Sequence, residues 1–289
     1  MSLTRINKEL AADLHTHTTV SDGDASPKEL VSLALGAGLN LLAVTDHDAV
    51  GGIAMAQQAA EGTSLSVLPG VEISTGGVNE YHILAYGDVT ASEELMGFLS
   101  VMRKERDDRM LEIYARLEAI GISLTPLARA DGKSIGRMHV GHQLVAAGYA
   151  KDVDEACERY LAVGKAGYVP RAHRDAGEII SKIAECGLVP VLAHPYLYKL
   201  PLPSLSQLID EWTSLGLKGI EVYHPTSVGR DIGALMAIAK RCGLIVTGGS
   251  DYHGHGSMHA PLGGMCKYWQ DMSSCCENLL TAISKPQNS

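Results

Sequence analysis

Short apolar runs recur along the chain, and each one carries or ends in polar residues that are unusual for a buried strand. The runs cover residues 11–17, 39–48, 65–74, 80–87, 188–195, 218–225 and 243–253. Runs of this length are typical of parallel strands that are buried on both faces. The intervening segments 26–38, 175–187, 204–216 and 229–243 are amphipathic and end in glycine, which favours helices. Strand–helix alternation repeated seven times predicts an α/β barrel.

One stretch breaks this alternation and is helical throughout. Residues 92–121 predict a long amphipathic helix with at most one interruption, and residues 136–148 and 152–164 predict shorter helices. We therefore expect a barrel from residues 1–90 and 167–289, with a helical insertion at 91–166. Because it follows the fourth strand, the insertion should lie over the barrel mouth as a lid or substrate subdomain.

Composition narrows the function classes. The chain has 289 residues, 46% hydrophobic, but only one phenylalanine and two tryptophans, so its core should be aliphatic. A net charge of −9 argues against a long nucleic-acid groove, which needs a dense basic surface. A small anionic substrate held by a few cations and metal ions remains compatible with this charge.

The cysteines and the hydropathy pattern indicate a cytoplasmic protein. None of the six cysteines forms a C-x-x-C pair, which favours reduced thiols over a disulfide framework. We find no signal-peptide pattern, and no apolar run approaches the ~20 residues needed to span a bilayer. No membrane association is expected, and the oligomeric state cannot be predicted.

The first apolar run raises the question of chemistry. His15 and His17 end it, and Asp22 follows in a Ser-Asp-Gly turn. Side chains at i and i+2 of a strand share a face, so two imidazoles and a nearby carboxylate can converge on a metal ion. A single H-x-H pair is more often incidental, and the rest of the chain must decide.

The other runs carry the same residue types. Together they give six histidines and three carboxylates: His15, His17, Asp22, His47, Glu72, His82, His194, Asp251 and His253. In a barrel these side chains should gather at the rim where active sites lie. Burying them together without compensation would be costly, and divalent cations supply the compensation. Imidazole and carboxylate ligands suit Mn²⁺, Fe²⁺ or Zn²⁺.

The motifs that contain these residues resemble those of the PHP (polymerase and histidinol phosphatase) family. They are "DLHTHTTVSDG", "AVTDHD", "PGVEIS", "AHP" and "GSDYHG", and they occur in the family's order over nearly the whole chain. The resemblance implies a distorted (β/α)7 barrel. Its details are similar to those of stand-alone phosphoesterases, which include 3′,5′-nucleoside bisphosphate phosphatases and 5′-to-3′ exoribonucleases. The chain has no polymerase domain.

The resemblance also implies three metal positions. His15, His17, Glu72 and Asp251 would hold a first ion. Glu72 would bridge to a second ion bound by His82 and His194. A third would lie between Asp22, His47 and His253, so that two or three divalent ions are expected.

Further residues are candidates for supporting roles. Asp46 could orient a ligand imidazole, or simply cap the following helix. His224 could be a general acid or a phosphate contact. The cations Arg137, His139 and Lys165 could bind a phosphate, although each alone is more often a solvated surface group.

We therefore expect a metal-dependent phosphoesterase that acts on a nucleoside 3′,5′-bisphosphate or a short 5′-phosphorylated RNA. Histidinol-phosphate phosphatase is an alternative within the same family. A non-catalytic, metal-stabilised binding module is an alternative of another class, but such a protein should lack some of the nine residues. A metal-dependent amidohydrolase is less compatible, because no lysine ends a predicted strand to carry a bridging carbamate.

Overall fold

The computed structural model describes residues 10–76, 80–127, 133–254 and 260–285. The remaining parts of the predicted barrel and insertion lie outside the described residues. One seven-stranded sheet runs in chain order. Its strands are β1 (Ala12–Asp13), β2 (Leu41–Val44), β3 (Ser66–Ser74), β4 (His82–Tyr86), β5 (Val189–Leu192), β6 (Gly219–Tyr223) and β7 (Ile245–Gly248).

The two edges of this sheet meet and nearly close it into a barrel. The Leu14 backbone N–H donates to the Gly248 carbonyl at 3.2 Å, and the His17 N–H donates to the Tyr252 carbonyl at 2.9 Å. Gly249 permits this approach, because a Cβ there would lie only 2.4 Å from the Cβ of His15. The predicted barrel is confirmed.

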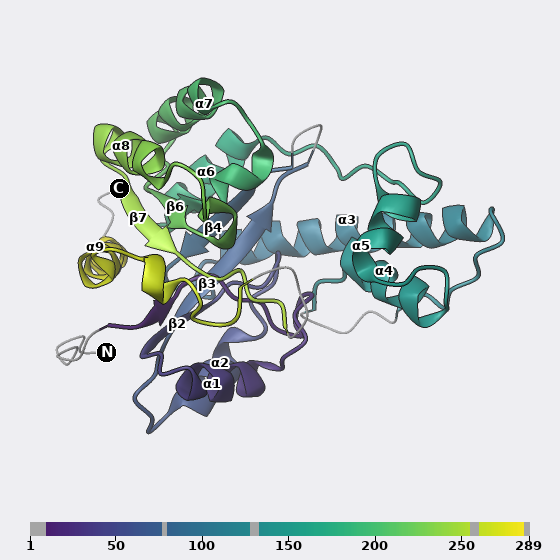
Figure 1. Cartoon of the computed structure of the whole chain (residues 1–289), viewed down its shortest axis with the longest axis horizontal. Helices are drawn as coiled ribbons and strands as arrows, with labels where there is room; N and C mark the ends of the chain where they lie inside the picture. The colour runs from purple at the N-terminus through teal and green to yellow at the C-terminus, as the bar shows by residue number, and fades with distance from the viewer. Residues whose placement is uncertain (1–9, 77–79, 128–132, 255–259, 286–289) are drawn as a thin grey trace.

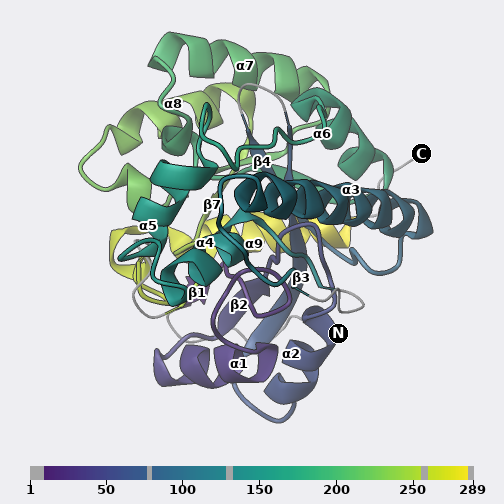
Figure 2. The ribbon, with the colours of Figure 1, turned by 90° about the vertical axis from the view of Figure 1, so that its right-hand side faces the viewer.

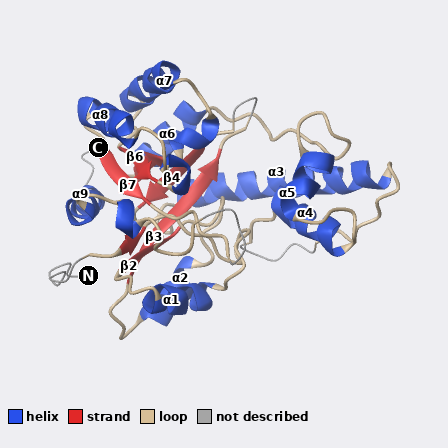
Figure 3. Ribbon diagram, in the orientation of Figure 1, coloured by secondary structure: helices blue, strands red, loops and turns tan. Residues whose placement is uncertain are grey.

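The helices cover the outside of the sheet (Figures 1 and 3). Those of the barrel are α1 (Pro27–Gly36), α2 (Ile53–Ala60), α6 (Ala176–Glu185), α7 (Leu202–Ser214), α8 (Ile232–Cys242) and α9 (Met272–Ser284). Short 3₁₀ turns follow at Pro195–Tyr198, Pro225–Ser227 and Cys266–Tyr268. The start of α1 shows why a helix begins at this position. Ser26 and Glu29 form a capping box around a proline at the first helical position.

The expectation of strand–helix alternation throughout is wrong at β4. This strand is antiparallel to both of its neighbours, β3 and β5. Only residues 75–81 connect β3 to β4, too few for the helical crossover that a parallel pair needs. The reversal has a consequence for the site. His82 begins β4 opposite Ser74, the last residue of β3, so it lies at the rim where the parallel strands end.

Aliphatic side chains fill the core, as the composition predicts. All four residues of β2 and all four of β5 are buried, and one cluster joins the strands to the barrel helices. The six cysteines are free. Among the described residues, no helix is both long and apolar enough to cross a membrane.

A helical segment lies between β4 and β5. It contains α3 (Glu93–Glu118), α4 (Arg137–Ala146), α5 (Val153–Ala156) and a π-helical turn (Cys157–Leu161). The long helix α3 is continuous over 26 residues, without the allowed interruption. In Figure 1 these elements extend to one side of the sheet, and Figure 2 shows them in front of it.

The long helix connects two hydrophobic clusters. Leu95 and Leu99 in its first half belong to the barrel core, whereas Ile113 and Leu117 in its second half pack with Leu144 of α4 in a separate cluster. The insertion therefore has its own small core and is attached to the barrel through α3. Its function as a lid stays a prediction.

Candidate metal centre

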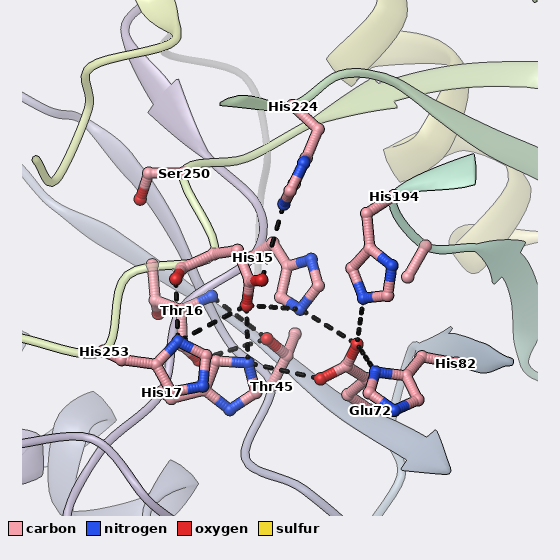
Figure 4. A network of polar contacts seen from close by, with 12 residues as sticks. His15, Thr16, His17, Thr45, Glu72, His82, His194, His224, Ser250 and His253 are labelled. Carbon is pink, nitrogen blue, oxygen red and sulfur yellow. Dashed lines mark hydrogen bonds and ion pairs between the residues drawn. The ribbon is translucent and has the colours of Figure 1, made fainter. Parts of the chain in front are cut away.

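The nine predicted ligand residues come together at one rim of the barrel. Figure 4 labels six of them, His15, His17, Glu72, His82, His194 and His253. Most of the nine lie at the end of a strand or in the loop that follows it, whereas His82 is the first residue of its strand. They are His15, His17, Asp22, His47, Glu72, His82, His194, Asp251 and His253. The structure brings these nine side chains together, and their role as ligands stays a prediction.

Glu72 is the centre of the cluster. Its Oε1 lies 2.9 Å from His82 Nδ1, 3.0 Å from His194 Nε2 and 3.3 Å from His15 Nε2. Its Oε2 lies 2.9 Å from His47 Nδ1 and 3.2 Å from His17 Nε2. Five imidazoles thus surround one fully buried carboxylate.

Asp251 completes a four-residue group around His15 and His17. Its Oδ1 lies 3.4 Å from the Nε2 of His15 and 3.2 Å from the Nε2 of His17. With Glu72, these residues offer four ligand atoms within 4.8 Å of one another. Asp251 has a left-handed φ of 52°, a conformation that asparagine and aspartate tolerate better than most residues. The group matches the first predicted ion position.

A second compact group forms around Asp22. It contains His17, Asp22, His47 and His253, again with ligand atoms within 4.8 Å. Asp22 Oδ1 lies 3.4 Å from His253 Nε2 and 3.9 Å from His47 Nε2. The predicted third position thus has its three residues together, with His17 added to them.

The remaining position differs from its predicted composition. His82 and His194 both contact Glu72 Oε1, but the compact group that could hold an ion is His47, Glu72 and His82. Glu72 and His47 each belong to more than one group. The three groups therefore overlap, which is suited to ions that share ligands.

The polar atoms at the centre indicate that positive ions belong there. His15 Nε2, His17 Nε2, His47 Nδ1, Asp22 Oδ1 and Glu72 Oε2 are buried without a hydrogen-bond partner among the described residues. Leaving such atoms unsatisfied is costly, whereas a divalent cation would satisfy imidazole nitrogens and carboxylate oxygens together. The donor set fits a multinuclear metal centre.

The electrostatics of the protein alone lead to the same conclusion. Burial lowers the pKa of His17, but the acceptors Asp251 and Glu72 outweigh it and raise this pKa to about 10. Burial raises the pKa of Glu72, yet the surrounding imidazoles hold it well below its usual range. The buried carboxylates are therefore stabilised by positive charge close to them, which protonated imidazoles or metal ions can supply.

Glu221, a buried residue of β6, lies directly behind the cluster and was not predicted from the sequence. Its Oε1 lies 3.1 Å from His15 Nδ1, and its Oε2 accepts a hydrogen bond of 2.8 Å from the His194 N–H. A carboxylate that accepts a hydrogen bond from Nδ1 keeps the proton of the neutral ring on that atom. The lone pair of His15 Nε2 therefore faces Glu72 and Asp251. The available signal was a glutamate inside the apolar run 218–225.

Asp46 supports the site by a different route from the one predicted. It accepts hydrogen bonds from the Thr18 N–H at 2.7 Å and from the Ser21 hydroxyl at 2.6 Å, so it fixes the loop that carries Asp22. It reaches a ligand imidazole only through Ser21, whose Oγ lies 3.4 Å from His17 Nδ1. The alternative role as a helix cap is wrong, because Gly52 precedes α2 without a side-chain cap.

His224 lies at the edge of the cluster and is almost fully buried. Its Nδ1 accepts a hydrogen bond from the Thr226 N–H at 3.1 Å, which leaves the proton of the neutral ring on Nε2. That atom lies 3.4 Å from Asp251 Oδ2. Burial lowers the pKa of His224, which favours the neutral ring.

The three predicted phosphate contacts occupy different environments. Burial lowers the pKa of His139, and the charge of Asp22 opposes this shift. Arg137 begins α4, and its charge helps Arg171 to lower the pKa of the largely buried Glu80. Lys165 is exposed in a turn, and no contact within the described chain joins it to the cluster.

Comparison with known proteins identifies the family. A model of the PHP domain matches residues 13–169, more than half of the chain. The chain belongs to the PHP family. It is 34% identical over 253 residues to a 3′,5′-nucleoside bisphosphate phosphatase from Chromobacterium violaceum, covering 84% of this chain and 87% of the relative. The identity is also 34% to the 5′-3′ exoribonuclease Rnm of Escherichia coli, with 86% of each protein covered.

A solved PHP-like structure agrees over nearly the full length. It is a Chromobacterium violaceum chain described as an amidohydrolase with bound sulfate and no metal. It superimposes with a TM-score of 0.83 at 31% identity, covering 96% of this chain and 99% of the other. The resemblance drawn from the strand-end motifs and the distorted barrel expected from it are both confirmed.

Proposed function

We propose that this PHP protein hydrolyses a terminal phosphate monoester of a nucleoside 3′,5′-bisphosphate or of a short 5′-phosphorylated RNA. The observation that carries the proposal is the set of overlapping groups around Glu72, which hold eight of the nine residues, while the ninth, His194, contacts Glu72 directly. The chain is a metal-dependent phosphoesterase, and its substrate class follows from relatives whose names specify nucleotide and RNA substrates. This disfavours a non-catalytic binding module.

The metal positions are proposed from the geometry. Asp251, His15 and His17 would hold one divalent ion with Glu72, and Glu72 would be shared with a neighbouring ion near His82. Asp22 and His253 would anchor a third. Mn²⁺, Fe²⁺ and Zn²⁺ all suit these ligands, and two or three ions would fit. When bound, such ions supply charge against the phosphate and make water more acidic.

Protein side chains set the orientation of the reacting groups. Glu221 fixes the ring of His15 through Nδ1, and Asp46 fixes the loop of Asp22. His224 presents an Nε2 proton on the cluster side of its ring, beside Asp251, where it could donate to a phosphate or leaving-group oxygen. His139 and Arg137 would contact the substrate from α4. Lys165 would do so only if its turn moved toward the site.

Phosphate release with Mn²⁺ tests the proposal directly. Adenosine 3′,5′-bisphosphate, AMP, histidinol phosphate and a short 5′-phosphorylated RNA are compared at one salt concentration through kcat/KM. We expect the bisphosphate or the RNA to be the best substrate. Faster turnover of histidinol phosphate would overturn the nucleotide assignment but leave the phosphoesterase intact. The absence of both phosphate release and nucleotide release from all four would overturn the proposed function.

A further inference from the structure

Four arginines line a pocket between α3 and the segment that returns to the barrel. Arg106 and Arg109 come from α3, and Arg171 and Arg174 come from the segment before α6. The only carboxylates in this lining are those of Asp48 and Glu105. We call these four arginines and the space between them the arginine pocket.

The pocket shares a wall with the metal centre. Asp48 lines it and directly follows His47 in the chain. Ser74 also lines it, and Ser74 pairs with His82 across β3 and β4. A molecule that reached the cluster around Glu72 would therefore have the arginine pocket beside it.

Two of the arginines are neutralised by the pocket's own acids. The Nε of Arg106 donates to Asp48 Oδ2 at 3.0 Å, and Arg174 pairs with Glu105 at 2.5 Å. The Nε of Arg174 nevertheless remains buried without a hydrogen-bond partner among the described residues.

The other two arginines are incompletely compensated. Arg109 donates through Nε to the Val169 carbonyl at 2.7 Å, and within the described chain it forms no ion pair. Arg171 has Glu80 at 3.4 Å, but its buried Nε lacks a partner with hydrogen-bond geometry. The lining thus has more cations than anions, and two of its buried guanidinium donors form no hydrogen bond within the described chain.

Burial and neighbouring positive charges both lower the pKa values of these two arginines. Burial lowers the pKa of Arg171 to about 10, and the charge of Arg106 adds to this effect. Burial also lowers the pKa of Arg109 to about 10, with Arg137 and Arg106 acting in the same direction. Both guanidiniums remain charged at neutral pH, so mutual repulsion persists until an anion enters.

We propose that the arginine pocket binds the second phosphate of the substrate, the one that is not hydrolysed. This inference rests on the proposed function and adds the part of the site that would select a bisphosphate over a monophosphate. Guanidinium groups suit phosphate because they donate paired hydrogen bonds in one plane. The pocket shares the lining residues Thr75 and Arg174 with a neighbouring cleft of about 630 Å³.

Two arginine variants and one control test the assignment. Arg109→Gln and Arg171→Gln remove the poorly compensated cations, and Arg159→Gln removes an exposed cation of the insertion outside the pocket. The measured quantity is the ratio of kcat/KM for adenosine 3′,5′-bisphosphate to kcat/KM for 3′-AMP and 5′-AMP. Loss of a charged hydrogen bond should lower this ratio roughly 10- to 100-fold in the pocket variants. The control should retain the wild-type ratio.

A binding measurement separates the pocket from catalysis. Calorimetry of adenosine 3′,5′-bisphosphate with EDTA-treated protein should show weaker binding, by about tenfold or more, for the pocket variants only. Circular dichroism verifies that each variant is folded, and Arg109→Gln serves if Arg171→Gln does not fold. Wild-type ratios and affinities in the folded variants would overturn the pocket. Wild-type binding without hydrolysis of any ester would instead overturn the proposed function.

Discussion

The barrel rim and the arginine pocket lie side by side, yet they are built in different ways. At the rim, the ligand candidates lie in strands or in the loops that follow them, so the register of one sheet brings five imidazoles within about 3 Å of Glu72. The pocket instead combines the middle of a long helix with a segment more than 60 residues later, and Asp48 joins it from the barrel. One region is organised by hydrogen-bonded strands, the other by packing between distant segments.

The two regions also differ in the charges that they bring together. The rim gathers opposite charges, and metal ions would hold them together. The pocket gathers like charges, and among the described residues Asp48, Glu80 and Glu105 form ion pairs with them. Arg106 connects the two regions, because its partner Asp48 also accepts a hydrogen bond from the Ser74 N–H at 3.0 Å. The insertion is thereby linked to the loop that carries His47.

The largest effect should follow from removing the centre of the rim. Glu72→Gln keeps the size of the side chain but removes the charge that five imidazoles face. We expect kcat/KM to fall at least ~1000-fold, because the charge stabilisation supplied by metal ions is worth several kcal/mol.

Metal analysis is the second readout of the Glu72 variant. Wild-type protein should carry two or more equivalents of transition metal, and Glu72→Gln should carry fewer. The matched control is Glu112→Gln, at an exposed position on α3, which should change neither quantity. One equivalent or less in an active wild-type preparation would contradict the multinuclear centre.

The next effect concerns the link between the two regions. Arg106→Met would leave the buried Asp48 carboxylate without its ion partner. Breaking a buried pair on one side costs roughly 3–5 kcal/mol in the free energy of unfolding. Lys104→Met, which breaks an exposed pair with Asp108 on the same helix, should cost less than about 1 kcal/mol. Urea unfolding at neutral pH compares them, and equal losses would show that Arg106 does not connect the regions.

The sequence predicted the rim better than the pocket, and the reason is physical. A histidine or carboxylate at the end of an apolar run is conspicuous, and parallel strands in a barrel place such ends together. The reversed direction of β4 was not predicted, because the run 80–87 looks the same in either direction. The position of His82 at the start of its run was the available signal.

The arginines gave no comparable signal. Arg106 and Arg109 lie three residues apart in a strongly charged stretch of α3, where such residues usually face solvent. Arg171 and Arg174 have the same spacing in a segment without periodicity. Only the packing of α3 against that segment shows that these side chains are mostly buried and share one pocket.

A smaller effect should follow from changing the support behind the rim. Glu221→Gln leaves a side chain of the same shape next to His15 and His194 but weakens both hydrogen bonds. Removing such a support typically costs about 10- to 100-fold in metal affinity or activity. Metal titration of apo protein and kcat/KM measure it, with the exposed Glu61→Gln as control. Unchanged metal affinity would mean that packing alone orients His15.

The smallest effects on kcat/KM should come from replacing Arg137 and Lys165, two cations of the insertion. Arg137 begins α4 near Glu80 and the arginine pocket, whereas Lys165 is exposed in its turn. If Arg137 contacts a substrate phosphate, Arg137→Ala should lower kcat/KM for adenosine 3′,5′-bisphosphate by ~10-fold or more, the value of a charged hydrogen bond. Lys165→Ala should lower it by less than about threefold, because an exposed, screened charge contributes little. Metal content should stay at the wild-type level in both variants, since neither side chain belongs to the cluster around Glu72.

Equal losses of kcat/KM in the two variants would instead mean that the turn of Lys165 closes onto bound substrate, and the two cations would then act together as a lid. Wild-type kinetics for Arg137→Ala would place this arginine in solvent and leave the pocket as the phosphate contact on this side of the site.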